Sequence, residues 1–289
     1  MAETEIRLVV DGDIPALQEF LATRPSTTMF LRSNLERVGL QDHGRAYEGT
    51  WAAAFRGSEV VGVAAHFWTG RLILECPDSL EPVVRCAVAA SPRPLSGVLG
   101  PWEQAVAARR ALAAENQPTR LESREALFAL ELDALRVPPA LEKKTVRGRT
   151  PTSQEVESIL TGWRVQFVVE SLGADPTDDE YQNAGERLRR EAAEGSLWVL
   201  EVEGELVAMT GFNARLADCV QIGGVFTPPS LRGRGYARCA VAASLISART
   251  EGVERSILFT GDDNTAAQRC YQALGYELIG DYAIIHFRE

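Results

Sequence analysis

The order in which apolar runs and helix-compatible segments alternate after residue 143 constrains the fold more than any other feature of the chain. Taken in turn, the segments predict a strand, two helices, three strands, a helix, a strand, a helix and a final strand. Helices inserted among strands in this way pack on the faces of a sheet, so the pattern indicates the α/β class, with an α+β type mixed sheet. The strands are expected at 145–149, 197–202, 206–212, 219–226, 256–260 and 282–287.

Local signals mark where several of these elements begin or end. Thr152 and Glu155 have the spacing of a capping box, which opens a helix. Glu-Gly-Glu at 203–205 separates two apolar runs and predicts a hairpin. The charged run at 187–191 has the composition of a solvated helix face. Helices are expected from 152 to about 172, from after 175–177 to about 195, from 235 to 250 and from 265 to 274.

The chain has 289 residues, which is enough for two ordinary domains. Pro138 and Pro139 cannot continue a helix or a central strand, so we place a domain boundary beside them. The predicted domains are residues 1–140 and 141–289. A strand, a glycine turn and a second strand begin at Trp51 and again at Trp198, which favours an internal duplication, although unrelated hairpins share this pattern.

Composition excludes several classes of protein. The chain is 45% hydrophobic, and no run approaches the roughly 18 apolar residues of a membrane helix. Its acidic start does not resemble a secretory signal, so we expect a cytoplasmic protein with no membrane partner. A net charge of −10 argues against nucleic-acid binding, which needs a basic surface. Five scattered cysteines and three isolated histidines predict neither a disulfide framework nor a metal site.

Residues 225–238 carry the strongest functional signal. They join a predicted strand to a helix of small residues, and a glycine turn there exposes backbone N–H groups at the positive end of the helix dipole. Gly233 and Gly235 lack a Cβ, so phosphate oxygens can approach the backbone. Pro228 and Pro229 end the hydrogen bonding of the strand and open a gap in which a ligand could pair. The pattern predicts a pyrophosphate site, with a plain solvated turn as the alternative, and it matches neither a dinucleotide fingerprint nor a P-loop.

Two motifs in the second half of the chain resemble those of the GNAT superfamily of N-acetyltransferases. Its R/Q-x-x-G-x-G/A signature is matched at Arg232, Gly235 and Ala237. Its downstream N-x-x-A-x-x-x-Y motif is matched at Asn264, Ala267 and Tyr271. The resemblance covers roughly 143–289 and extends to a bacterial group of predicted acetyltransferases and to glycine N-acyltransferase-like proteins. It implies two GNAT-like units in tandem, of which the first is degenerate because it lacks the loop signature.

The resemblance implies acetyl-CoA as co-substrate and assigns a role to each motif residue. In such enzymes the loop backbone holds the coenzyme pyrophosphate, the preceding strand pairs with the pantetheine arm, and the downstream motif contacts the coenzyme. Tyr271 matches the tyrosine that protonates the departing thiolate, a leaving group of pKa ~8.5 that needs only a positioned hydroxyl. The implied coenzyme-binding residues are Val225, Phe226, Thr227, Arg232, Gly233, Arg234, Gly235, Tyr236, Ala237, Arg238, Asn264, Ala267 and Tyr271.

The expected reaction moves an acetyl group to an amine of a small molecule or amino acid by direct attack, without a metal. The general base stays open, because Glu201, Glu203 and Glu205 all lie around the hairpin and Gln221 cannot accept a proton. One alternative is a non-catalytic acyl-CoA-binding regulatory or protein-interaction module, and another is transfer to a protein lysine or N-terminus. A small-molecule amine is the expected partner, and a homodimer stays open.

Overall fold

The computed structural model of the chain describes residues 3–172 and 178–288. It forms two compact units, which we call unit 1 (Met1–Ala126 with Gly280–Glu289) and unit 2 (Leu127–Ile279). The division falls inside two long strands, β6 (Thr119–Glu131) and β12 (Glu277–Phe287). Unit 1 is therefore built from two separate stretches of chain. The predicted domain ranges, 1–140 and 141–289, stay a prediction.

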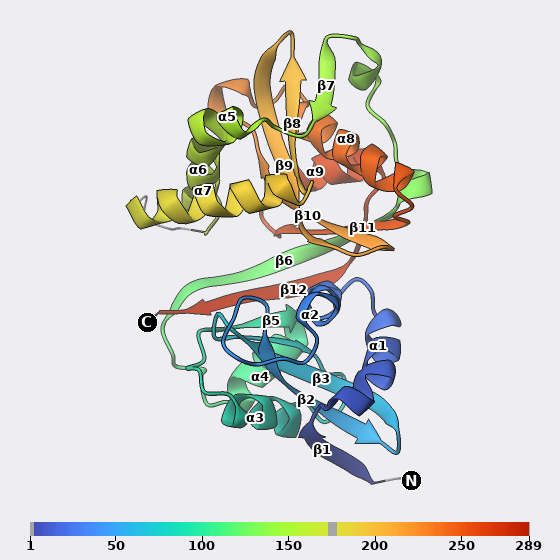
Figure 1. Ribbon diagram of the computed structural model, residues 1–289, viewed down its shortest axis with the longest axis vertical. Helices are drawn as coiled ribbons and strands as arrows, with labels where there is room; N and C mark the ends of the chain where they lie inside the picture. The colour runs from blue at the N-terminus through green and yellow to red at the C-terminus, as the bar shows by residue number, and fades with distance from the viewer. Residues whose placement is uncertain (1–2, 173–177, 289) are drawn as a thin grey trace. The chain divides into compact units, whose positions relative to one another are not determined.

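Unit 1 follows the order strand, two helices, three strands, helix, strand, helix (Figure 1). Its sheet has the strand order β1-β2-β3-β4-β5-β12-β6. The elements before β6 are β1 (Thr4–Leu8), η1 (Asp11–Asp13), α1 (Ile14–Ala22), α2 (Met29–Val38), β2 (Gly49–Arg56), β3 (Glu59–Phe67), β4 (Arg71–Glu75), α3 (Leu80–Ala90), β5 (Gly97–Pro101) and α4 (Trp102–Ala111).

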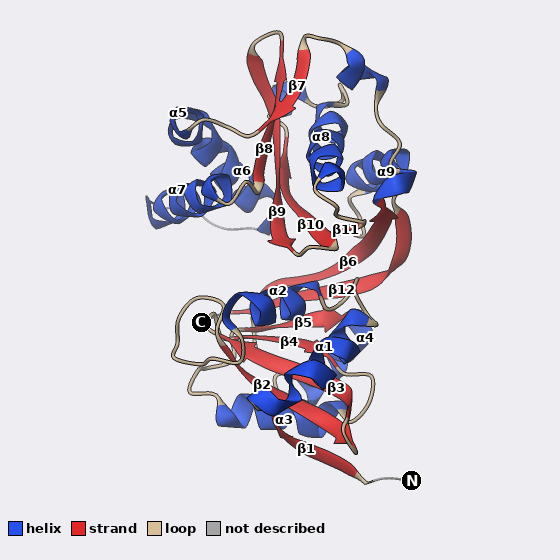
Figure 2. Cartoon of the chain, turned by 45° about the vertical axis from the view of Figure 1, so that its right-hand side comes forward, coloured by secondary structure: helices blue, strands red, loops and turns tan. Residues whose placement is uncertain are grey.

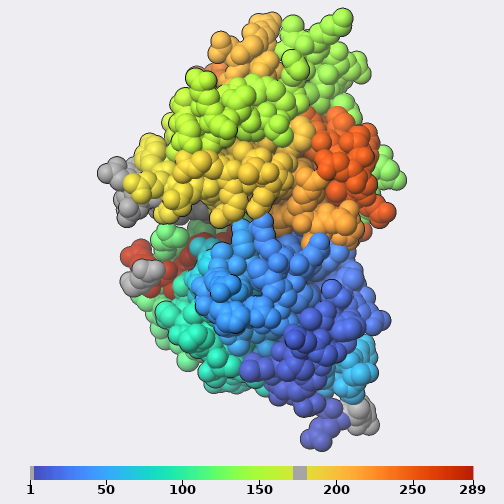
Figure 3. Space-filling view, viewed as in Figure 1, coloured from blue at the N-terminus to red at the C-terminus, as the bar shows by residue number. Residues whose placement is uncertain are grey.

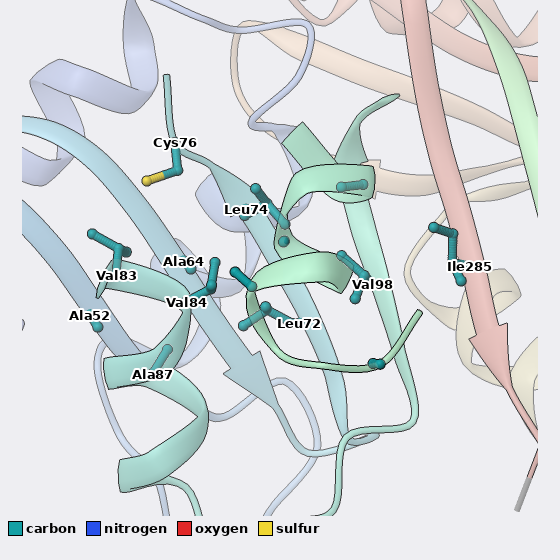
Figure 4. Close-up of a cluster of buried hydrophobic side chains, with 14 of the residues drawn as sticks. Ala52, Ala64, Leu72, Leu74, Cys76, Val83, Val84, Ala87, Val98 and Ile285 are labelled. Atoms are coloured by element: carbon teal, nitrogen blue, oxygen red, sulfur yellow. The ribbon is translucent and has the colours of Figure 1, made fainter. Parts of the chain in front are cut away.

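One apolar core of unit 1 lies between its sheet and helices α3 and α4, and Figure 4 shows part of it. Ala52 and Ala54 of β2, like Leu72 and Leu74 of β4, are two residues apart and belong to this cluster, as the period of two in a strand requires. Ile285 of β12 belongs to the same cluster, because β12 runs antiparallel to β5 from Tyr282↔Pro101 to His286↔Gly97. The last described strand of the chain thus completes the sheet that the first strands begin.

Unit 2 repeats the element order of unit 1. Its strands follow the order β7-β8-β9-β10-β11, and β6 is the next neighbour of β11. The elements are η2 (Leu132–Ala134), η3 (Pro139–Glu142), β7 (Val146–Arg149), α5 (Ser153–Glu155), the π-helical turn η4 (Val156–Leu160), α6 (Thr161–Leu172), α7 (Asp178–Ala193), β8 (Leu197–Val202), β9 (Glu205–Arg215), β10 (Cys219–Phe226), η5 (Pro229–Leu231), α8 (Tyr236–Thr250), β11 (Arg255–Gly261) and α9 (Thr265–Leu274).

Helices cover both faces of the unit 2 sheet (Figure 2). On one face, Val199, Met209 and Phe226 pack with apolar residues of η4 and α7. On the other, Leu200 and Ala208 pack against Cys239 and Ala240 of α8. Neighbouring residues of a strand thus pack against helices on opposite faces of the sheet. Both must be apolar, so the strands are nearly continuous apolar runs in the sequence.

The structure confirms the predicted mixed α/β fold, built from two units that share one element order. Both units contain a hairpin with a two-residue turn, closed by Arg56↔Glu59 in unit 1 and by Val202↔Glu205 in unit 2. All the predicted strands and helices of the second half form, and the final strand begins earlier than expected, at Glu277. The predicted start of the second helix at 175–177 lies outside the described residues. None of the helices in residues 3–172 and 178–288 combines the length and the apolar character needed to cross a bilayer.

Candidate active site

The end of β10 separates from its parallel neighbour. The pairing of β10 with β11 ends at Ile222↔Leu258, although β10 continues to Phe226. A bulge opposite β9 follows Gly223, and Gly224 inside it has a φ of 58°. A bulge bends its strand, so the end of β10 turns out of the parallel ladder. The resulting strand edge is one on which a ligand with amide groups can pair.

The three strand residues predicted to contact the coenzyme lie at this edge. Val225 is half-buried, while Phe226 and Thr227 are buried. The Thr227 hydroxyl is buried and meets no hydrogen-bond partner among the described residues. The Phe226 ring packs against Trp163 of α6, with 6.1 Å between ring centroids. The Phe226 side chain is therefore held against α6.

The loop that follows β10 presents free backbone donors. Gly235 has a φ of 79° and stands at the N-cap of α8 without a side-chain cap. Cys239 makes the first helical bond, to the Gly235 carbonyl, at 3.1 Å. The backbone N–H groups of residues 233–238 meet no protein acceptor in the part of the chain that the structure describes. Donors of this kind at the start of a 15-residue helix form an anion site.

The three arginines of the loop differ in what they contact. Arg232 Nε donates to the Thr227 carbonyl at 2.9 Å, and its Nη2 pairs with Glu170 of α6 at 2.6 Å. Arg234 is exposed, and its Nη2 donates to the Ser230 carbonyl at 3.4 Å. Arg232 therefore holds the loop against β10 and α6, which its motif position alone did not show.

Arg238 is the loop cation best placed for a phosphate. Its Nη2 lies 3.6 Å from the position that a Cβ on Gly235 would take. Its Nε is buried and has no partner in the described part of the chain. A buried guanidinium donor without an acceptor is costly unless a ligand satisfies it. Arg238 thus lies beside the loop backbone at which a pyrophosphate is predicted.

The downstream motif forms the start of α9. Asn264 is the N-cap, and its Oδ1 accepts from the Ala267 N–H at 3.2 Å. The Asn264 Oδ1 and the Ala267 N–H are therefore paired with each other, and the NH₂ group of the exposed Asn264 side chain is available to a ligand.

Cys270 lies beside Arg238, but burial raises the pKa of its thiol to about 11, so it is a poor nucleophile at neutral pH.

Tyr271 combines a buried ring with a hydroxyl that has no protein partner among the described residues. Its ring packs edge-on against Tyr276, whose own hydroxyl pairs with Ser256 Oγ at 2.6 Å. Burial raises the pKa of Tyr271, as does the neighbouring Cys270. The phenol therefore stays protonated at neutral pH and can donate.

The candidate bases around the hairpin do not gather at the loop. Glu201 is paired with Arg149 at 2.7 Å. Glu203 lies in the β8–β9 turn, with a φ of 55°, and Glu205 begins β9 beside it. Gln221 is buried, and its Oε1 meets no partner among the described residues.

The run at 187–191 is only in part the solvated face that its composition predicted, because Arg187, Arg189 and Arg190 are exposed whereas Leu188 and Glu191 are buried. Glu191 pairs with Arg164 of α6, which is also buried. The sequence held a sign of this burial, because Leu188 and Glu191 are three residues apart and therefore share one helix face.

Unit 1 closes the corresponding position. Its β4 is followed by residues 76–79 and then α3, so the loop is shorter than the 227–235 connection of unit 2. Gln104 of α4 accepts from the Cys76 N–H at 2.5 Å and thereby occupies the strand edge. Asp78 places a negative charge in the loop and pairs with Arg56. The described residues of unit 1 thus form a shorter loop that carries an acidic side chain, beside a strand edge that Gln104 covers.

The comparisons with known proteins agree with this geometry. Residues 161–276 match the acetyltransferase (GNAT) family model. No curated protein matches the chain in sequence. Among solved structures, a GNAT-family acetyltransferase from Colwellia psychrerythraea is 16% identical, covers 98% of this chain and 100% of its own, and has a TM-score of 0.56.

Two further structures span nearly the whole chain. A GCN5-related N-acetyltransferase from Sphaerobacter thermophilus is 15% identical, with 100% and 97% of the two chains covered and a TM-score of 0.56. A Drosophila protein is 11% identical, with 98% of each chain covered and a TM-score of 0.68. At these identities the structures establish the fold alone. Because residues 161–276 match the family model, this part of the chain belongs to the acetyltransferase (GNAT) family, and the loop and the separated strands are consistent with that match.

Proposed function

We propose that unit 2 is an acetyl-CoA-dependent N-acetyltransferase that acts on an amine of a small molecule or amino acid. The observation that carries the proposal is the row of unpaired N–H groups at residues 233–238 beside the open edge of β10. A pyrophosphate at the loop would accept hydrogen bonds from these N–H groups, and a pantetheine arm along Val225 to Thr227 would pair with the edge of β10. Arg238 would supply the charge that the otherwise acidic chain lacks.

The reaction would proceed by direct attack. The amine nitrogen bonds to the thioester carbonyl carbon while the carbon–sulfur bond breaks, and a backbone N–H near Val225 and Phe226 stabilises the oxyanion. Tyr271 gives its proton to the departing thiolate, and the amine loses one proton to solvent, from which Tyr271 is reprotonated. The high pKa of the Cys270 thiol is consistent with a route that forms no acyl-enzyme.

The test is calorimetric titration of acetyl-CoA into the full chain and into Gly235→Asp. The wild-type protein is expected to bind one equivalent per chain, because the corresponding loop of unit 1 is shorter, carries Asp78 and lies beside a strand edge covered by Gln104. Gly235→Asp should bind at least 100-fold more weakly, since it places a carboxylate among the phosphate donors. Asparagine has nearly the same size as aspartate, carries no charge and tolerates a positive φ. Gly235→Asn should therefore lose less affinity than Gly235→Asp, and the difference between the two variants measures the effect of the negative charge apart from that of side-chain size.

Gly252→Asp is the matched control, because Gly252 also has a positive φ, of 93°, and lies in open space. It should bind as the wild type does. If Gly235→Asp binds acetyl-CoA with unchanged affinity, the loop assignment is wrong. Binding without turnover of any amine would favour the non-catalytic module instead.

A further inference from the structure

A positive cluster is buried beneath the β10 bulge, on the face covered by α6 and α7. Arg164 is 3% exposed and pairs with Glu191 through Nη2–Oε2 at 2.7 Å and Nη1–Oε1 at 3.4 Å. Arg187 also donates to Glu191, through Nε at 2.8 Å. Two guanidinium groups therefore share one carboxylate, which leaves one positive charge uncompensated within this group. The buried member, Arg164, therefore has only a carboxylate that it shares with the half-exposed Arg187.

The unused donors of Arg164 lie at the bulge. Its Nη2 is 2.9 Å from the position that a Cβ on Gly224 would take, so a side chain there would collide with the guanidinium. Its Nε is buried and has no partner within the described residues. Guanidinium carries five N–H donors, and Glu191 accepts only two of them here. The guanidinium that carries the remaining donors lies against Gly224, which directly precedes the strand residues proposed to hold the pantetheine arm.

The cluster extends from the bulge to the surface. The Arg187 side chain is 50% exposed, and its Nη2 donates to Asn213 Oδ1 at 3.3 Å. Asn213 is exposed and fills the space where Gly223 would carry a Cβ. Figure 3 shows α7, which carries Arg187, on the surface of unit 2. A ligand arriving from solvent would therefore meet Arg187 before Arg164.

We propose that Arg187 and Arg164 bind a carboxylate of the acceptor, so that the acceptor is a small amino acid or a related amino-carboxylate. This inference rests on the proposed function. Gly224 directly precedes Val225, and neighbouring Cα atoms are about 3.8 Å apart. A carboxylate on the arginines would thus lie only a few bonds from an amine that attacks the thioester at Val225 and Phe226. An α-amino acid has this spacing.

The positive cluster also suits the chemistry of the attack. A carboxylate and a guanidinium form paired, charge-assisted hydrogen bonds, which fix orientation as well as position. The same positive charge disfavours the protonated form of the nearby amine. The free amine is the nucleophile, so the cluster would bind the acceptor and favour its reactive form.

The experiment compares each of several amino acids with its α-carboxamide, using the full chain and saturating acetyl-CoA. The acids should have a KM at least tenfold lower than the amides. In Arg187→Gln the KM for the acids should rise about tenfold or more, while the KM for the amides should not change. Arg187→Lys keeps the charge and should recover part of the preference. Melting temperatures and acetyl-CoA affinity establish that each variant is folded and loaded.

Arg189→Gln is the matched control. Arg189 lies on the same helix, its side chain is 51% exposed, and it pairs with Glu157 at 2.7 Å, away from Glu191. It should keep the preference for acids. Equal use of acids and amides, or a preference that survives Arg187→Gln, overturns the proposal. If acetyl-CoA binds in a Gly235-dependent manner but neither acids nor amides are acetylated, the acceptor class is wrong while the coenzyme site stands.

Discussion

Tyr271 and Tyr276 show how two similar side chains, five residues apart, come to differ in role. Both are buried, and burial raises the pKa of each. Tyr276 uses its hydroxyl on Ser256, whereas that of Tyr271 meets no partner among the described residues. The hydroxyl of Tyr276 is therefore used within the core, whereas that of Tyr271 is available as a proton donor.

Tyr271→Phe is therefore expected to lower kcat by about 100-fold or more while leaving the acetyl-CoA affinity nearly unchanged. Removing the hydroxyl deletes the proton donor and keeps the ring packing. The measurement is kcat from pH 6 to 9, with calorimetric affinity alongside. Tyr276→Phe is the control and should reduce stability with little effect on kcat, because it loses a buried hydrogen bond. Equal kcat for Tyr271→Phe and wild type across this range would remove Tyr271 from the mechanism.

The helix from Ser153 to Leu172 carries its own stabilising device at its start. Thr152 and Glu155 form the predicted capping box, with Glu155 Oε2 accepting from the Thr152 N–H at 2.7 Å. Arg149 pairs with the same carboxylate at 2.6 Å. These bonds to Arg149, followed by those to Thr152, lower the pKa of Glu155 to about 2. The element thus depends on an ionised carboxylate.

Glu155→Gln should lower the free energy of unfolding by about 1 kcal/mol at pH 7. Because the folded pKa is depressed below the usual 4.5, this stability is present above pH 4.5 and is lost as pH falls toward 2. The difference between variant and wild type should therefore shrink over that interval in urea titrations. Glu157→Gln, at an exposed ion pair, should change little at any pH. A difference that persists at pH 2 would contradict the assignment.

Elements with strong local signals could be predicted from the sequence. The capping box, the two-residue hairpin turn and the glycine loop each depend on residues close in the chain, and all three form where predicted. The π-helical turn at 156–160 could not be predicted, because its end residues, Val156 and Leu160, are buried against the sheet and contacts of that range leave no local signal. The Arg164–Glu191 pair was missed because composition made 187–191 resemble a surface.

The completion of the two sheets also lay beyond sequence reasoning. β12 completes unit 1 beside β5, and the Leu127–Glu131 end of β6 completes unit 2 beside β11. Each half of the chain therefore supplies a strand that the other half uses. Pairings of such long range leave no local signal, since both strands have ordinary apolar patterns.

This exchange predicts how fragments of the chain behave. A fragment of residues 141–289 lacks Leu127, Phe128 and Leu130, which are buried, and keeps Tyr282 and Ile285 without their unit 1 neighbours. We expect it to aggregate or to unfold without a cooperative transition. A fragment of residues 127–279 is the control and should melt cooperatively and bind acetyl-CoA. Circular dichroism melts compare the two, and equal cooperativity would favour the boundary predicted beside Pro138 and Pro139.

The strand exchange has a consequence for synthesis on the ribosome. β12 leaves the exit tunnel only after every element of unit 2, so β5 waits with an unpaired edge while the rest of the chain is made. An unpaired apolar strand edge is a template for association with other nascent chains. Codons that slow elongation late in the message would lengthen this exposure. The half of the protein that is made first is therefore the half that finishes folding last.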